Sequence, residues 1–243
     1  MDEPRVIIIP ALSDNYMYLL VSGSRAAVID PAEAAPVLEA LSRHDLTLEW
    51  ILNTHHHFDH VAGNEELKRG TGATIISPEN ARIPGVDRTV GEGDTLDFHG
   101  IEIRVLATPG HGRDDVSYFI PSSETVSESM LFCGDTLFVC GCGRLLEGTP
   151  DDMWASLRKL TELPDETRIY CGHEYTEENV RFALGEEPGN ESLRNLLEEV
   201  RTRLRRGEPT VPSNIGMEKR TNPFLRAADV RQFIRLRRKK DVF

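Results

Sequence analysis

The segment His55-His56-His57-Phe58-Asp59-His60 constrains this chain more than any other part of it. Four imidazoles and one carboxylate stand close together there, and such groups suit zinc, iron or manganese. Residues 49–53 before the segment have the pattern of a short apolar strand, and residues 61–69 after it have that of a helix. The polar groups therefore fall at the carboxyl end of a strand, where open sheets tend to place binding sites. This arrangement predicts a metal site.

The spacing within the segment sorts its side chains into two sets. Successive side chains of an extended chain point to opposite sides. His55, His57 and Asp59 therefore share one face, while His56 and Phe58 point away from it. We expect the first set to hold the metal and His56 to have a supporting or structural part. The alternative is that Asp59 caps the following helix and the imidazoles form a polar surface loop.

Composition limits the classes of protein to which the chain can belong. Its 243 residues suffice for one large domain or for a core with a smaller second domain. The net charge of −12 argues against general nucleic-acid binding, which requires a basic surface. No apolar run is long enough to span a membrane, and the start at residues 1–5 lacks the basic region of a signal peptide. The 4 cysteines form no secreted-type framework, so we expect a cytoplasmic protein.

Hydrophobic periodicity divides the chain near residue 172. Before that point, strands are predicted over residues 6–9, 16–21, 26–29, 49–53, 74–77, 95–98, 101–106, 116–120, 130–132 and 167–170, and helices over 35–44, 61–69 and 149–160. After it, helices are predicted over residues 177–183, 192–206 and 227–238, with no strand signal. We expect a strand-rich α/β part over residues 1–171 and a small helical domain over residues 172–243. Cys140-Gly141-Cys142 lacks the spacing of a zinc knuckle and is predicted to be a loop.

Three further metal-compatible side chains follow predicted strands. His111 stands between two glycines directly after an apolar strand, and Asp135 follows the apolar run that ends at Gly134. His173 follows the strand that ends near Cys171. Polar groups after four separate strands indicate that they converge on one site, whereas a single such group is usually a capped turn.

Several motifs resemble the metallo-β-lactamase superfamily and, within it, glyoxalase II, the hydroxyacylglutathione hydrolases. The superfamily motifs are Thr54 to His60, Thr108-Pro109-Gly110-His111, Gly134-Asp135-Thr136 and Cys171-Gly172-His173. The glyoxalase II motifs include Phe132 to Phe138, Gly141 to Arg144, Glu147-Gly148-Thr149, His173 to Thr176, Asn222 to Arg226 and Arg237 to Asp241. The resemblance covers nearly the whole chain. It implies an α/β fold of the α+β type, a four-layer αββα sandwich as the catalytic domain over residues 1–171, and a C-terminal helical substrate-binding domain over residues 172–243.

The resemblance also implies how the ligands are shared between two divalent metal ions, zinc first, with iron or manganese as alternatives. One ion would be held by His55, His57 and His111, the other by Asp59, His60 and His173, and Asp135 would bridge the two. Two cations lower the pKa of a bridging water to give hydroxide and stabilise the oxyanion that forms in thioester hydrolysis. Asp135, as the bridging ligand that the resemblance implies, and Asp59, which could orient the hydroxide through its second oxygen, are the expected catalytic residues.

The basic C-terminal segment bears on the substrate. Residues 226–241 hold Arg226, Arg231, Arg235, Arg237, Arg238, Lys239 and Lys240 in an otherwise acidic chain. Such a run is usually a solvated surface, but it could also capture a carboxylate, for which arginine offers a forked donor set. The resemblance implies glutathione-binding roles for Arg144, Tyr175, Arg237 and Lys240. Two features depart from the family: Leu145-Leu146 follow Arg144 where some members have a tyrosine, and Gly112 to Asp115 add two acids after His111.

The leading functional hypothesis is hydrolysis of S-D-lactoylglutathione to glutathione and D-lactate, the second step of methylglyoxal detoxification. The runner-up is a mononuclear-iron persulfide dioxygenase, a relative that lacks or shortens the basic helical tail. A non-catalytic metal-binding module would not need an open two-metal site, and a β-lactamase is disfavoured because no cysteine stands where a second-site ligand is needed. The expected partner is a small-molecule substrate, a glutathione thioester. We expect no nucleic-acid or membrane partner, and we expect the protein to be a monomer.

Overall fold

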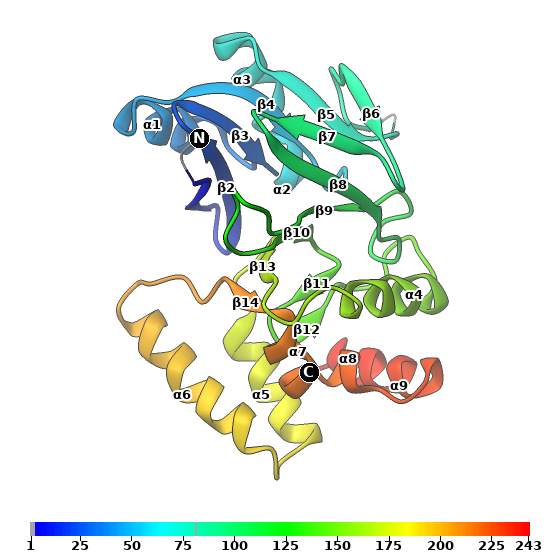
Figure 1. Ribbon diagram of the computed structural model, residues 1–243. Coiled ribbons are helices and arrows are strands. Elements are labelled where there is room, and N and C mark those ends of the chain that lie inside the picture. The colour runs from blue at the N-terminus through cyan, green and yellow to red at the C-terminus, as the bar shows by residue number, and fades with distance from the viewer. Residues whose placement is uncertain (1–2, 81) are drawn as a thin grey trace.

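Two six-stranded sheets form the centre of the molecule, and helices cover them (Figure 1). The computed structural model describes residues 3–80 and 82–243. Met1 and Asp2, part of the start that lacks the basic region of a signal peptide, lie outside the described residues. The first sheet has the order β1-β2-β3-β4-β5-β6 and the second the order β14-β13-β10-β9-β8-β7, while β11 and β12 pair separately. The strands are β1 Arg5–Ala11, β2 Asn15–Ser22, β3 Arg25–Ile29, β4 Thr47–Leu52, β5 Thr74–Pro78, β6 Arg88–Val90, β7 Thr95–Phe98, β8 Ile101–Ala107, β9 Val116–Ile120, β10 Met130–Gly134, β11 Leu137–Phe138, β12 Gly141–Cys142, β13 Arg168–Cys171 and β14 Ser213–Asn214.

The first sheet is buried on both faces, which is why its strands are nearly continuous apolar runs. Alternate residues of β2 enter two different cores: Tyr18 and Leu20 pack toward the second sheet, while Leu19 and Val21 pack toward the helices. On the helix side, Val37 and other side chains complete the outer core. The result is the four-layer αββα sandwich, so the predicted fold class is confirmed.

The helices cover the outer faces of the sandwich and build the C-terminal part (Figure 1). They are α1 Ala34–Arg43, α2 Phe58–Val61, α3 Asn64–Thr71, α4 Pro150–Thr161, α5 Thr176–Glu186, α6 Glu191–Arg205, α7 Ile215–Thr221, α8 Pro223–Arg226 and α9 Val230–Lys240. Helix α4 begins as its sequence indicates, because Thr149 and Asp152 form a reciprocal capping box and Pro150 occupies the first turn. No helix in the described ranges is both long and apolar enough to cross a membrane.

Some local predictions are wrong. The helix expected over residues 61–69 is two helices, α2 and α3, because the chain breaks at Gly63, whose N–H donates to the carbonyl of Pro31 at 2.8 Å. A Cβ at Gly63 would stand 2.8 Å from that oxygen, so only glycine allows this approach. The loop predicted over Cys140 to Cys142 contains the short strand β12.

The region after residue 172 is not free of strands, since β14 pairs with β13 through Ile169 and Ser213. Strands β6 and β11 and helices α7 and α8 were also not predicted. Each of these elements is only two to seven residues long. Such short segments carry too few residues for a hydrophobic period, and backbone partners elsewhere in the chain decide their structure.

The C-terminal helices share a core with the sandwich. Phe224, Phe233 and Leu236 belong to the same buried cluster as Met153 and Leu157 of α4. The guanidinium of Arg158 also lies over the ring of Trp154, whose indole is 5.9 Å from the Phe233 ring. Because one apolar core joins the two parts, we expect them to unfold together.

Phe224→Ala tests this shared core. The ring is fully buried, so its loss should lower the free energy of unfolding by about 3–5 kcal/mol. Denaturant unfolding followed by tryptophan fluorescence and by circular dichroism should still give one coincident transition. Phe58→Ala is the matched control, because that ring is 80% exposed and its removal should change stability by less than about 0.5 kcal/mol. Two separate transitions would contradict the shared core.

Candidate metal centre

The predicted ligands meet at one end of the sandwich. The turn after β4 carries His55 and His57, and the loops after β8 and β10 carry His111 and Asp135. His173 follows β13 in the same way. These strands belong to both sheets, so the two sheets together bring the side chains to one place.

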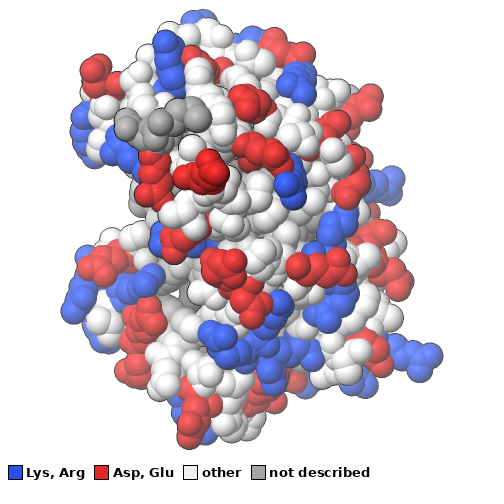
Figure 2. Space-filling view, in the orientation of Figure 1, with Lys and Arg blue, Asp and Glu red and all other residues white. Residues whose placement is uncertain are grey.

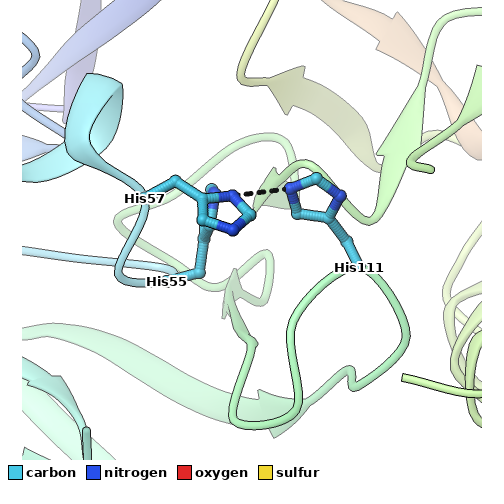
Figure 3. Close-up of side chains that lie close together, drawn as sticks. All are labelled: His55, His57 and His111. Atoms are coloured by element: carbon cyan, nitrogen blue, oxygen red, sulfur yellow. Dashed lines mark hydrogen bonds between the residues drawn. The ribbon is translucent and has the colours of Figure 1, made fainter. Parts of the chain in front are cut away.

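Three imidazoles form the first group (Figure 3). Nδ1 of His57 lies 2.9 Å from Nε2 of His111. The ring of His55 is 4.7 Å from that of His57 and 5.2 Å from that of His111, centroid to centroid. One nitrogen from each ring lies within 4.8 Å of the other two, a spacing that allows three ligands to share one cation.

The second group contains Asp59, His60 and His173, again with one donor atom from each within 4.8 Å of the others. Nε2 of His60 lies 3.3 Å from Nε2 of His173. Oδ2 of Asp59 lies 3.6 Å and 3.4 Å from these two nitrogens, respectively. Zinc, iron and manganese all accept mixed imidazole and carboxylate donors, so the donor set indicates divalent metal binding without selecting one metal.

Asp135 stands between the two groups. Its Oδ2 lies 3.4 Å from Nε2 of His111, in the first group, and 3.3 Å from Nε2 of His173, in the second. Its Oδ1 lies 3.5 Å from Nε2 of His60. One buried carboxylate thus faces both sets of donors, which is the position that a bridging ligand would need.

Oxygen atoms behind the imidazoles fix which ring nitrogen is free. Nδ1–H of His55 donates to Oγ1 of Thr54 at 3.0 Å, and Nδ1–H of His111 donates to the carbonyl of Arg144 at 2.8 Å. A carbonyl can only accept, and the Thr54 hydroxyl already donates its proton to Asp30, so both contacts place the proton on Nδ1 and leave Nε2 unprotonated for a metal. In the described ranges, Nε2 of His55 and Oδ1 of Asp135 are buried without a hydrogen-bond partner, which is expected of atoms whose partner is a cation.

Two acidic residues that back the second group were missed from the sequence. Nδ1–H of His60 donates to Asp30 at 3.1 Å, and Nδ1–H of His173 donates to Asp14 at 2.8 Å. Asn15 also donates to Oδ2 of Asp59 at 3.0 Å. The only sequence signal for Asp14 and Asp30 is their place in turns at strand ends, a place that turn-forming aspartates also occupy.

Charge in the pocket favours a cation. Burial opposes protonation of His60, but Asp135, Asp30 and Asp59 outweigh it and raise its pKa to about 9. Burial and the neighbouring His111 lower the pKa of His57 to about 4, which keeps that ring neutral. The carboxylates that hold a proton on His60 would equally attract a metal ion, which must displace that proton to bind.

Two glycines are needed where the ligand loops pass one another. A Cβ at Gly134, whose φ is +47°, would lie 2.2 Å from Oγ1 of Thr54. A Cβ at Gly172 would lie 2.3 Å from Oδ1 of Asp135 and 2.7 Å from Cε1 of His60. In Gly134-Asp135 and in Gly172-His173, the glycine directly before the ligand therefore lets the backbone come close to the neighbouring ligand loop.

His56 belongs to neither ligand group, as its spacing predicts, although one of its nitrogens lies within 4.8 Å of a nitrogen of His57. Its Nε2 lies 3.3 Å from Glu147, which Arg82 holds through two hydrogen bonds of 2.6 Å and 2.9 Å.

Of the two acids that depart from the family pattern, Asp115 is buried and accepts the N–H of Gly112 at 2.6 Å, so it closes the turn after His111. Burial raises the pKa of this carboxyl to about 7.

A cavity of about 370 Å³ extends from the metal centre toward the C-terminal helices. His111 and Asp135 line one end of it, and its remaining walls include the four expected substrate-binding residues, Arg144, Tyr175, Arg237 and Lys240. The ring of Tyr175 stacks on that of His173 with centroids 4.8 Å apart. The predicted substrate residues therefore share one cavity with two of the predicted ligands.

The three basic groups of this cavity have different surroundings. Arg237 is buried, donates to the carbonyl of Cys142 at 2.7 Å and pairs with Asp241 at 2.9 Å. Lys240 pairs with Glu178. Arg144 is exposed and forms no ion pair with any residue in the described ranges.

Other basic residues of the C-terminal segment lie on the surface. Lys and Arg side chains gather over the lower half of the face shown in Figure 2, where Figure 1 places α7, α8 and α9. Arg226 pairs with Glu187 and Lys239 with Glu186, while Arg231, Arg235 and Arg238 are exposed. These five residues therefore form a solvated surface, which was one of the two interpretations of the basic segment.

Comparison with known proteins adds the family. The model of the metallo-beta-lactamase superfamily matches residues 12–173, and that of the hydroxyacylglutathione hydrolase C-terminus matches residues 174–243. A hydroxyacylglutathione hydrolase of Rhodospirillum rubrum is 48% identical over 97% of this chain and 97% of its own length. Among solved structures, ETHE1 from Myxococcus xanthus is 28% identical, with a TM-score of 0.73 over 97% of this chain and 89% of that one.

TTHA1623, solved in a di-iron-bound form, is 25% identical, with a TM-score of 0.63 over 90% of this chain and 99% of that one. Together the two family models cover residues 12–243. The C-terminal model matters most for the subfamily, because it covers the helices that lie beyond the superfamily match. The chain therefore belongs to the hydroxyacylglutathione hydrolases of the metallo-β-lactamase superfamily.

Proposed function

We propose that this protein hydrolyses the thioester bond of S-2-hydroxyacylglutathiones, with S-D-lactoylglutathione as substrate and glutathione and D-lactate as products. One observation carries the proposal beyond the family relationship. A single cavity joins two metal-ligand candidates, His111 and Asp135, to the basic side chains of Arg144, Arg237 and Lys240. A thioester can thus lie at the metal end while the carboxylates of the glutathione moiety lie among the cations. This is the second step of methylglyoxal detoxification.

The two donor groups fit two divalent cations. His55, His57 and His111 would hold one ion, Asp59, His60 and His173 the other, and Asp135 would serve both. Such a pair of ions supplies a water of lowered pKa and stabilises negative charge that develops on the thioester oxygen. We propose zinc as the metal, with iron or manganese as alternatives that the same donors accept.

The chain's own groups position the reactants. Asp59 is held by Asn15 through Oδ2 and also offers a carboxylate to the attacking water, so it can orient that water and receive its proton. In the net reaction the water oxygen bonds to the acyl carbon, the carbon–sulfur bond breaks, and the sulfur leaves as a thiolate. A thiolate is a good leaving group, so no strong general acid is required. Asp135, by facing both donor groups, fixes the distance between them.

The division of labour follows the two parts of the chain. We assign catalysis mainly to residues 1–171, to which His173 adds one metal ligand from just beyond that boundary, and much of the glutathione binding to residues 172–243, which supply Tyr175, Arg237 and Lys240 to the cavity. We further propose a cytoplasmic monomer, in keeping with the four buried, unpaired cysteines Cys133, Cys140, Cys142 and Cys171. The persulfide dioxygenase alternative is not favoured, because the hydroxyacylglutathione hydrolase C-terminal model matches residues 174–243.

Asp135→Ala tests the metal part of the proposal. Loss of the carboxylate that faces both donor groups should release both ions and abolish turnover together. Metal content by atomic emission and thiol release from S-D-lactoylglutathione should be measured on the same sample, and the unaltered protein should hold about two ions per chain. Asp151→Ala is the control, because Asp151 is exposed in the first turn of α4, away from the ligands. Normal turnover by Asp135→Ala would remove Asp135 from its proposed role.

Arg144→Ala tests the substrate part. Arg144 lines the cavity and has no ion-pair partner in the described ranges, so its guanidinium is free for a carboxylate. A hydrogen bond to a charged group contributes about 1.5–3 kcal/mol, so KM should rise about tenfold or more. kcat should change little, because the contact is remote from the bond that breaks. Arg181→Ala, an exposed arginine on α5, should leave both constants unaltered; an unchanged KM in Arg144→Ala would assign Arg144 to the solvated surface.

A further inference from the structure

Glu178 forms an ion pair with Lys240, the lysine that a carboxylate of the proposed substrate should bind. Its carboxylate contacts Nζ of Lys240, and both side chains line the cavity that begins at Asp135. Glu178 belongs to the first turn of α5, whereas Lys240 ends α9, so the two come together only through the fold.

The two partners differ in how much of each side chain is exposed to solvent. The side chain of Lys240 is only 8% exposed, with its ammonium 5.2 Å from the centre of the Phe243 ring and 5.9 Å from that of Phe182. The side chain of Glu178 is 60% exposed. A largely buried ammonium requires a counter-charge, and the exposed partner is the one that can turn to water without a desolvation penalty.

Charge in the cavity is balanced before any substrate arrives. Lys240 faces Glu178 and Arg237 faces Asp241, which leaves Arg144 as the cation of the lining without an ion pair in the described part of the chain. A substrate carboxylate that approaches Lys240 therefore meets another carboxylate already in contact with it. Two like charges on one cation compete, and the weaker competitor is displaced.

We infer that Glu178 is a resident competitor of the substrate carboxylate at Lys240 and so sets the affinity of the cavity for glutathione thioesters. In the free enzyme it neutralises Lys240 and holds that side chain in place. When substrate binds, the carboxylate of the glutathione moiety replaces it and Glu178 turns to solvent. The inference rests on the proposed function, because it requires a carboxylate-bearing substrate in this cavity.

Glu178→Gln tests this role in the metal-loaded enzyme. Removal of the competing charge should lower KM for S-D-lactoylglutathione about fivefold, the upper range of a partly exposed ion pair. kcat should stay unchanged, because the contact is remote from the thioester. The dissociation constant of the product glutathione, measured by calorimetry, should fall by the same factor.

Glu177→Gln is the matched control. It removes the same charge from the neighbouring residue, but Glu177 pairs with Arg201 at 3.0 Å and does not line this cavity. Its KM should therefore equal that of the unaltered enzyme. Equal decreases in Glu177→Gln and Glu178→Gln would show a general effect of net charge and overturn the inference.

A double-mutant cycle with Lys240→Gln isolates the competition. Lys240→Gln should raise KM, and Glu178→Gln should have no further effect in that background because the shared cation is gone. An unchanged or raised KM in Glu178→Gln alone would overturn the inference, and a raised value would indicate that Glu178 attracts the substrate's ammonium group. These outcomes leave the proposed function standing, since the unaltered enzyme still turns over; absence of turnover and of glutathione binding in the unaltered enzyme would overturn both.

Discussion

The carboxylate of Asp30 joins the fold of this protein to its metal centre. It accepts the N–H of Thr54 at 2.7 Å and the hydroxyl of Thr54 at 2.6 Å, and it faces Nδ1 of His60 at 3.1 Å. The hydroxyl of Thr54 in turn accepts from His55. One buried residue directly after β3 thus orients a ligand of each metal group, and these hydrogen bonds compensate a carboxylate that burial would otherwise disfavour.

Both sheets and the helical segment are needed to complete the site. The first sheet supplies the turn after β4, and the second supplies the loops that carry His111, Asp135 and His173. The helices close the other side of the cavity with Arg237 and Lys240. Since the helices share an apolar core with the sandwich, the position of the basic groups relative to the ligands is fixed by packing, and no flexible linker has to define it.

Prediction from the sequence succeeded where a feature is local or repeated. The six-residue histidine segment and the polar residues after strand ends pointed to seven side chains that lie close together in the structure, and their role as metal ligands stays a prediction. It failed for Asp14 and Asp30, whose partners are distant in the chain, and for Gly63, which is set by a close contact with Pro31. It failed also for β12 and β14, because a two-residue strand has no period and forms only where a partner strand is present.

The sequence by itself determined the chemistry of the donors, the fold class and the family, since these depend on residue types at fixed spacings and on hydrophobic periodicity. Only the tertiary structure decided which basic residues are free. Arg144, Arg237 and Lys240 are equally cationic in the sequence, yet Arg237 is engaged by Cys142 and Asp241, Lys240 by Glu178, and Arg144 has no ion pair in the described ranges. The Arg237–Asp241 pair joins residues four positions apart, so the sequence could supply it. The contacts of Arg237 with Cys142 and of Lys240 with Glu178 join residues far apart in the chain, and only packing brings them within the few ångströms at which Coulomb attraction and hydrogen bonding act.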